Sequence, residues 1–106
     1  MQNKILALLG LAKRGRNLVS GEFQTEEAIK NGSALLVIVA EDASDNTKKH
    51  FRDKCTFYEV PVCIYGKKEE LGRAIGMQER ASIGICNAGL AEQLEIKIRE
   101  NQQPVE

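Results

Sequence analysis

The sequence predicts an α/β fold in which helices cover both faces of a four-stranded sheet. Stretches with apolar residues at helical spacing alternate along the chain with short apolar runs rich in Val and Ile, which are typical of strands buried on both faces. The 106 residues suffice for one modest domain, with no linker, repeat or low-complexity segment. The resulting order, αβαβαβαβα, is that of a sheet sandwiched between helices.

The first part of the chain is expected to form two helices and two strands. The stretch "KILALLGLAKR" has an apolar stripe at helical spacing, with Asn3 before it and Gly15 behind it, and predicts a helix. The stretch "LVS" predicts a small strand. The segment "SGEFQTEEAIKNG" predicts a second helix that begins near Gly21 and stops at Asn31-Gly32. The apolar run "ALLVIVA" predicts a buried strand.

The rest of the chain continues the alternation. Ser44 is a suitable N-cap for a helix that runs to about Tyr58. The stretches "VPVCIY" and "ASIGICN" predict strands. Between them "GKKEELGRAIG" predicts a helix bounded by two glycines, and "AGLAEQLEIKIRE" predicts a last helix. We expect residues 1–106 to form one domain, with a frayed tail over about residues 100–106.

Composition excludes several classes of protein. The longest apolar run is too short to span a membrane, and the N-terminal stretch lacks the pattern of a signal peptide, so we expect a cytoplasmic protein without a membrane partner. Cys55, Cys63 and Cys86 form no CxxC pair, and His50 is the only histidine. A zinc site is therefore not expected, and we expect the three cysteines to be buried free thiols.

No catalytic or cofactor motif is apparent. The sequence lacks GxGxxG and P-loop patterns, and no Ser/His/Asp or Cys/His set stands out. Glu41-Asp42 after an apolar strand could be a metal-binding or phospho-acceptor pair, but two acids that open a helix more often complement its dipole and cap it. His50 lies beside Lys48 and Lys49, which indicates a solvated helix face. We expect no enzyme, cofactor, metal or small-molecule substrate.

Three strand-to-helix junctions carry polar residues: Ser20–Gln24, Glu41-Asp42 and Asn87–Gly89. At the first junction the backbone N–H groups of a helix start are joined by Glu22, Phe23 and Gln24, which offer hydrogen bonds and a flat surface of the kind that reads RNA bases.

Basic residues precede this junction. Lys13, Arg14 and Arg16 could hold phosphates there, although the net charge of the chain is zero. Alternatively, Phe23 is a core or staple aromatic, and the cations complete a helix C-terminus. The residues alone therefore indicate an RNA site and leave these structural interpretations open.

The whole chain resembles the kink-turn-binding ribosomal protein family, which includes the archaeal large-subunit kink-turn protein and the bacterial YlxQ-type paralogues. The segments "LGLAKRGRNLVSGE", "AIKNGSALLVIVAEDASDNTKKHFRDKCTFYEVPV" and "KKEELGRAIG" carry the resemblance, which runs from about Lys4 to Ile98 and is nearest to the YlxQ type. It implies a three-layer α/β/α sandwich with a mixed four-stranded sheet. It also implies binding to kink-turns, which are sharply bent internal loops with tandem sheared G·A pairs, in ribosomal or other non-coding RNA.

The resemblance also implies site residues. The family reads the G·A guanines with a G-x-N-E-x-x-K-like helix start, which falls here on Gly21 to Glu27. Gly21 matches and Gln24 stands where the family has Glu or Gln, but Phe23 replaces Asn and Glu27 replaces Lys. The carboxylate of Glu27 is expected to weaken binding relative to an ammonium group.

Two further loops are implied to contact the RNA. The acidic loop of the family falls on Glu41 and Asp42, and its second contact region falls on the stretch from Gly76 to Ala81. Within that stretch Met77 suits packing on an extruded base and Arg80 suits a phosphate or a base, beside Gly76 and Gln78.

Three functions follow from these observations. The first is a non-catalytic, ribosome- or RNA-associated kink-turn binder; the second is a protein-interaction module with weak or lost RNA affinity; the third is a relative of the substrate-binding domains attached to RNA methyltransferases. The first predicts that Lys13, Arg14, Arg16 and Arg80 lie on the same edge of the fold as Gly21–Gln24.

Overall fold

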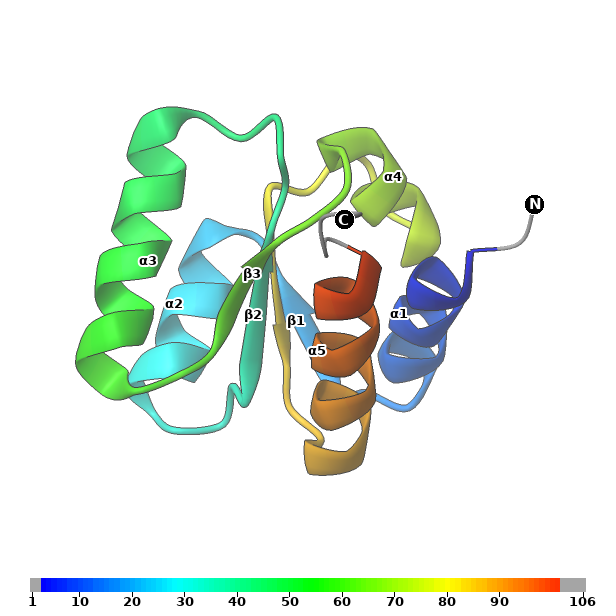
Figure 1. Ribbon diagram of the computed structural model, residues 1–106, viewed down its shortest axis with the longest axis horizontal. Coiled ribbons are helices and arrows are strands. Elements are labelled where there is room, and N and C mark those ends of the chain that lie inside the picture. Colours follow the sequence, from blue (N-terminus) through cyan, green and yellow to red (C-terminus); the bar gives the residue numbers. More distant parts are fainter. Residues whose placement is uncertain (1–2, 102–106) are drawn as a thin grey trace.

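The computed structural model describes residues 3–101, and within them the predicted order of elements is confirmed (Figure 1). The elements are α1 (Lys4–Arg14), β1 (Leu18–Ser20), α2 (Glu22–Lys30), β2 (Leu36–Val39), α3 (Asp45–Tyr58), β3 (Val62–Ile64), α4 (Lys68–Ala74), β4 (Ser82–Ile85) and α5 (Ala88–Asn101). Helix α5 continues through Asn101, so the expected frayed tail is helical at its start and otherwise lies outside the described residues.

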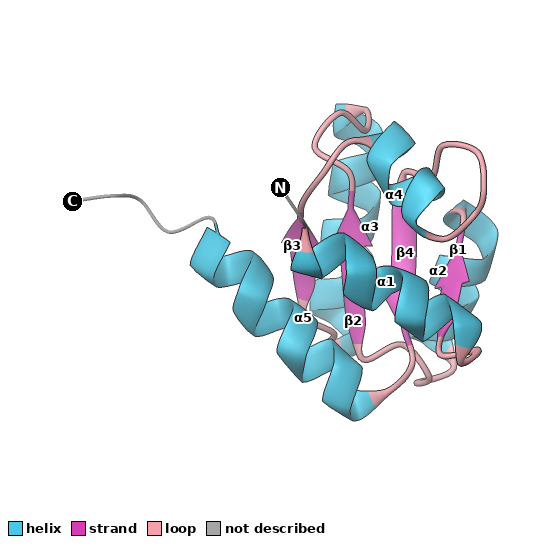
Figure 2. Cartoon of the chain, turned by 90° about the vertical axis from the view of Figure 1, so that its right-hand side faces the viewer, coloured by secondary structure: helices cyan, strands magenta, loops and turns pink. Residues whose placement is uncertain are grey.

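The sheet is mixed and four-stranded, with the strand order β1-β4-β2-β3. Strands β2 and β3 are parallel, whereas β4 runs antiparallel to both of its neighbours, β1 and β2. Helices α2 and α3 cover one face, and α1, α4 and α5 cover the other, as the two views show (Figures 1 and 2). The three-layer sandwich is therefore confirmed.

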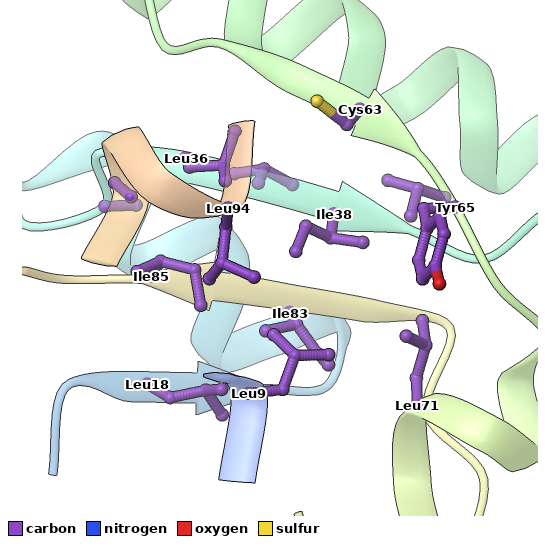
Figure 3. Packing of buried hydrophobic residues seen from close by; sticks show 14 of the residues in the cluster. Leu9, Leu18, Leu36, Ile38, Cys63, Tyr65, Leu71, Ile83, Ile85 and Leu94 are labelled. Atoms are coloured by element: carbon purple, nitrogen blue, oxygen red, sulfur yellow. The ribbon is translucent and has the colours of Figure 1, made fainter. Parts of the chain in front are cut away.

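The core lies on both faces of the central strands. All four residues of β2 are buried, which explains the continuous apolar run at this position. On the face covered by α1, α4 and α5, the side chains of Leu9, Leu71 and Leu94 pack toward Ile83 and Ile85 of β4 (Figure 3). This packing fixes the sheet as a rigid support for the loops at its ends.

Helix caps agree with the predicted starts. The side chain of Asn3 accepts a hydrogen bond from the Leu6 amide, and the side chain of Ser44 accepts one from the Thr47 amide. Asn3 also donates to the hydroxyl of Tyr65 over 2.9 Å, which ties the start of α1 to the end of β3.

The three cysteines are free thiols. Cys55 and Cys63 are buried, and burial raises the pKa of the Cys55 thiol to about 11. Cys86 is half-buried and lies just beyond β4 rather than inside it. No helix among residues 3–101 has the length and apolar character needed to cross a membrane, and no group of three potential metal ligands occurs there.

His50 is not simply on a solvated face, which corrects the sequence interpretation. Its Nε2 atom lies 3.0 Å from Oε1 of Glu26, so the ring joins α3 to α2. Lys54 and Lys30 also lie within ion-pair distance of Glu26. The hydrogen bond from His50 lowers the pKa of the Glu26 carboxyl, helped by the nearby charges of His50 and Lys54. The contact pairs residues 24 positions apart, which a local reading of the sequence does not reveal.

Candidate nucleic-acid interface

The start of α2 presents free backbone donors. Gly21 is the N-cap residue with φ 92° and ψ 158°, a conformation that essentially only glycine adopts, and no side chain caps the helix there. The first amides of α2 therefore lack the usual side-chain acceptor and suit an acidic or polar ligand. Phe23 is 75% exposed, so the alternative interpretation as a core aromatic is wrong.

The start of α2 lies beside the start of β4. The Gly21 amide donates to the Ser82 carbonyl over 3.0 Å, and the Ala40 amide donates to the Ala81 carbonyl over 2.9 Å. The end of β2 and the loop before β4 thus meet the start of α2 at one end of the sheet. We call the residues gathered there the loop edge. It comprises Gly21–Gln24, Glu41-Asp42, Gly66–Lys68 and residues 76–81.

Glu41 and Asp42 brace the neighbouring loop. Oδ1 of Asp42 accepts a hydrogen bond from the Lys68 amide over 2.9 Å, so this carboxylate caps α4 rather than its own helix. The Glu41 amide donates to the Gly66 carbonyl, and its carboxylate accepts from the Gly66 amide and lies 3.5 Å from Nζ of Lys67. Both acids are exposed, so their remaining oxygen atoms face solvent.

Gly72 holds the second predicted contact region against α4. A Cβ atom at this position would lie 1.9 Å from the carbonyl oxygen of Gln78, so only glycine allows the loop to approach the helix. The Met77 amide donates to the Gly72 carbonyl over 2.8 Å, and the Arg80 amide donates to the Lys68 carbonyl over 3.0 Å. Both ends of the loop of residues 76–80 are thereby hydrogen-bonded to α4.

The loop of residues 76–80 borders an open hollow. Met77 is 38% exposed there, which leaves an adaptable apolar surface. Other residues that line the hollow are Asp42, Glu69, Arg73, Gly76, Gln78 and Glu79. Arg80 is half-buried at the same edge, and its Nε atom is buried without a hydrogen-bond partner among the described residues. An unpaired buried donor of this kind is costly unless a ligand or solvent satisfies it.

The basic cluster of Lys13, Arg14 and Arg16 does not lie at the loop edge. This corrects the prediction that these residues share an edge of the fold with Gly21–Gln24. The Cys86 amide donates to the Asn17 carbonyl, so the loop that follows Lys13, Arg14 and Arg16 is at the far end of β4 from Ser82. Strand β1 has three residues and separates this loop from Gly21, and it carries the chain about 10 Å along the sheet. Of the four predicted cations only Arg80 is at the loop edge.

The third predicted junction, Asn87–Gly89, is also at the opposite end, because β4 runs antiparallel to its neighbours. There Oδ1 of Asn87 accepts from the Leu90 amide and caps α5. Sequence analysis missed Lys67 and Lys68 at the loop edge. A signal for them was present in the sequence, since "GKKEE" lies between a predicted strand and a predicted helix, as do the residues of the other two loop-edge junctions.

Glu27 is turned toward the C-terminal end of α2. Its carboxylate lies 3.6 Å from Nζ of Lys30, one turn further along the helix, and its side chain is half exposed. The pairing partly neutralises the carboxylate of Glu27, which stands at the position expected to correspond to the lysine of the family motif. It leaves Glu22, rather than Glu27, as the carboxylate in the first turn of α2.

The charges at the loop edge are mixed. Both lysines of the loop edge are paired, Lys67 with Glu41 and Lys68 with Glu79, in contacts of 3.5 and 3.8 Å. Arg80 makes no ion pair within residues 3–101. Recognition at this edge must therefore depend mainly on hydrogen bonds and surface contact rather than on a dense positive field.

Comparison with known proteins agrees with this architecture. Residues 3–95 match the model of the Ribosomal protein L7Ae/L30e/S12e/Gadd45 family. The chain is 44% identical over 87 residues to the protein named RNA-binding protein YlxQ of Bacillus subtilis (strain 168), covering 82% of this chain and 87% of that protein. It is 41% identical over 91 residues to RNA-binding protein YlxQ of Enterococcus faecium, covering 86% and 87%.

Solved structures with the same fold include the following two. One, described as a protein with unknown function from Bacillus halodurans C, has a TM-score of 0.89 and 46% identity over 92% of this chain and 99% of that chain. The other is the Giardia lamblia 15.5kD RNA binding protein, with a TM-score of 0.77 and 22% identity over 94% of this chain and 92% of that chain. The second likeness supports the fold alone.

Proposed function

Because the chain belongs to the ribosomal protein L7Ae/L30e/S12e/Gadd45 family, as a YlxQ-type member, we propose that it is a non-catalytic RNA-binding protein of the cytoplasm. Its proposed target is a kink-turn with tandem sheared G·A pairs, in ribosomal or another structured non-coding RNA. The name of its relatives in Bacillus subtilis and Enterococcus faecium, RNA-binding protein YlxQ, supports RNA as the ligand. The proposed binding surface is the loop edge.

The observation that carries this proposal is the meeting of the uncapped start of α2 with the loop that precedes β4. Free amides of the first turn and the side chain of Gln24 offer hydrogen bonds to guanine edges in a widened groove. Phe23, exposed on the same turn, offers a flat surface for a base. Met77 and Arg80 lie across the edge, where an extruded nucleotide would pack and a phosphate would meet a cation.

The proposed mechanism is selection of a bent RNA. A kink-turn interconverts between an open and a sharply kinked form, and a protein that binds only the kinked form shifts the population toward it. The rigid support suits this role: Gly21 is tied to Ser82, and the loop of residues 76–80 is pinned to α4. Little of the binding free energy is then lost in ordering the protein.

A titration of ¹⁵N-labelled protein with a kink-turn duplex tests this proposal. We expect the largest amide shifts at Gly21–Gln24 and residues 76–80. The amides of residues 13–17, at the opposite end of β4, should change little. Shifts confined to residues 13–17, or no shifts at all, would contradict the proposed surface.

A second candidate function is a protein-interaction module without RNA affinity. The pairing of Lys67 and Lys68 with acids at the loop edge favours it, because few free cations remain there for phosphates. The same titration separates the two functions, since an interaction module leaves the loop-edge amides unchanged when RNA is added.

A further inference from the structure

Helix α1 has a second apolar stripe that the fold buries only in part. Its core stripe consists of Ile5, Leu9 and Ala12. Ala7, Leu8 and Leu11 form the second stripe, on the side toward α5, and Leu11 is 48% exposed. Helices α1 and α5 lie side by side on the near face in Figure 2. Between them these residues, with Lys97, line a shallow groove of about 300 Å³.

Cations stand at the ends and side of this groove. Lys4 and Arg14 lie at its two ends on α1, about 15 Å apart along the helix axis. Lys97 lies on the α5 side. None of the three makes an ion pair with another residue in the described part of the chain. No acid lines the groove itself, although Glu100 lines the neighbouring hollow that also contains Lys4 and Lys97.

We propose that this groove between α1 and α5 is a docking site for an acidic amphipathic helix of a partner protein. Apolar side chains at positions i, i+3 and i+7 of such a helix would lie on Ala7, Leu8 and Leu11, as in other helix-in-groove complexes. Carboxylates that flank them would meet Lys4, Arg14 and Lys97. The cations at the rim therefore favour an acidic partner, and the apolar residues of the groove contribute the surface that the partner helix buries.

Other occupants fit these observations less well. A second copy of this chain in a two-fold contact would bring the same unpaired cations face to face. RNA would find phosphate partners at the rim, but the floor has no aromatic ring and no side-chain amide or hydroxyl for its bases. The site is distinct from the loop edge, so it does not depend on the RNA-binding proposal.

The test uses the full chain and a fluorescent helix-stabilised peptide with leucines at every third and fourth position flanked by glutamates. One control peptide keeps the leucines and replaces glutamate with lysine, and another keeps the glutamates and replaces leucine with serine. The protein variants are Leu11→Ser and Arg14→Glu. Arg52→Glu on α3 is a matched charge control, since Arg52 is exposed on the opposite layer.

We expect the acidic leucine peptide to bind, and neither control peptide to bind comparably. Leu11→Ser and Arg14→Glu should each weaken binding by about tenfold, and Arg52→Glu should leave it unchanged. Equal binding of the lysine peptide, or equal loss with all three variants, would overturn the proposal. So would concentration-dependent dimerisation that Leu11→Ser abolishes, or a loss of kink-turn affinity in Arg14→Glu that matches the loss of peptide binding.

Discussion

The amide of Gly21 donates a 3.0 Å hydrogen bond to the carbonyl oxygen of Ser82. This contact joins the start of α2 to the start of β4, and with them two loops that are far apart in the sequence. It sets the distance between the free amides of α2 and the loop of residues 76–80. The proposed RNA surface depends on this relationship, because neither loop alone offers more than a few polar groups.

Gly21→Ala should weaken both folding and RNA binding. At φ 92° and ψ 158° an alanine is strained by about 1–3 kcal/mol, and relief of the strain would move the first turn of α2 away from Ser82. Gly32→Ala is the matched control. Gly32 also has a positive φ, 84°, with no atom near its Cβ position, but it lies at the other end of α2. Thermal unfolding should show a loss for both variants, whereas RNA titration should show a loss only for Gly21→Ala. Equal RNA affinity of the two variants would contradict the proposed role of the α2 start.

Gly72→Ala should displace the loop of residues 76–80. A methyl group 1.9 Å from the Gln78 carbonyl forces the loop off α4, at a cost of about 1–3 kcal/mol or more in the free energy of unfolding. The control is Gly89→Ala, where the nearest atom to a new Cβ is at an ordinary 3.5 Å and alanine favours the helix. Denaturant unfolding should separate the two variants. A Gly72→Ala protein as stable as the wild type would mean that the loop is not held against α4.

Glu26→Gln should remove a pH-dependent part of the stability. The hydrogen bond from His50 lowers the pKa of Glu26 in the folded protein, so the ionised carboxylate stabilises the fold above the ordinary glutamate range, and this contribution is lost as the pH falls through the lowered pKa. The substitution should cost about 1 kcal/mol near neutral pH and less in acid. Unfolding measured between pH 3 and pH 7 checks this expectation, with Glu92→Gln as the control, since Glu92 is exposed and makes no ion pair within residues 3–101. A loss in the free energy of unfolding that is the same at every pH would contradict a contribution from the ionised Glu26 carboxylate.

Glu27→Lys should tighten kink-turn binding. Because Glu27 points toward Lys30 and not toward the first turn, its carboxylate is expected to be tolerated rather than used as an acceptor. A lysine in its place should add about 1–2 kcal/mol if it makes a charge-assisted hydrogen bond. The gain should shrink with rising salt, as one more cation contact adds about one to the counterion-release count. Glu92→Lys on α5 makes the same charge change far from the edge and should not alter affinity. Weaker binding by Glu27→Lys, with poorer discrimination between RNAs, would instead identify Glu27 as an acceptor from guanine.

The order of the elements and their caps could be predicted because they depend on local signals. Asn3 and Ser44 are the N-cap residues of α1 and α3, as their side chains predict, and the apolar run of β2 predicts a buried strand without knowledge of its partner strands. The resemblance to the family supplied what local signals lack, namely a mixed four-stranded sheet and the loops expected to contact RNA, whereas the strand order β1-β4-β2-β3 was seen only in the structure.

The position of the basic cluster could not be predicted from sequence distance. Arg16 is only five residues from Gly21, yet those residues include β1, and an extended chain covers the length of a short strand in that number. The same limit applies to Asn87, because strand direction follows from pairing between distant segments. The Glu26–His50 contact likewise needed the packing of α2 on α3 to become visible.

The paired titration of one RNA with and without its G·A pairs tests the central claim most directly. The protein is titrated against a kink-turn duplex with tandem sheared G·A pairs, and against the same duplex with those pairs replaced by Watson–Crick pairs, at one fixed salt concentration. We predict tighter binding to the kink-turn by at least about tenfold. Equal affinity for the two duplexes, or binding to neither, would contradict the assignment of kink-turn recognition to this chain.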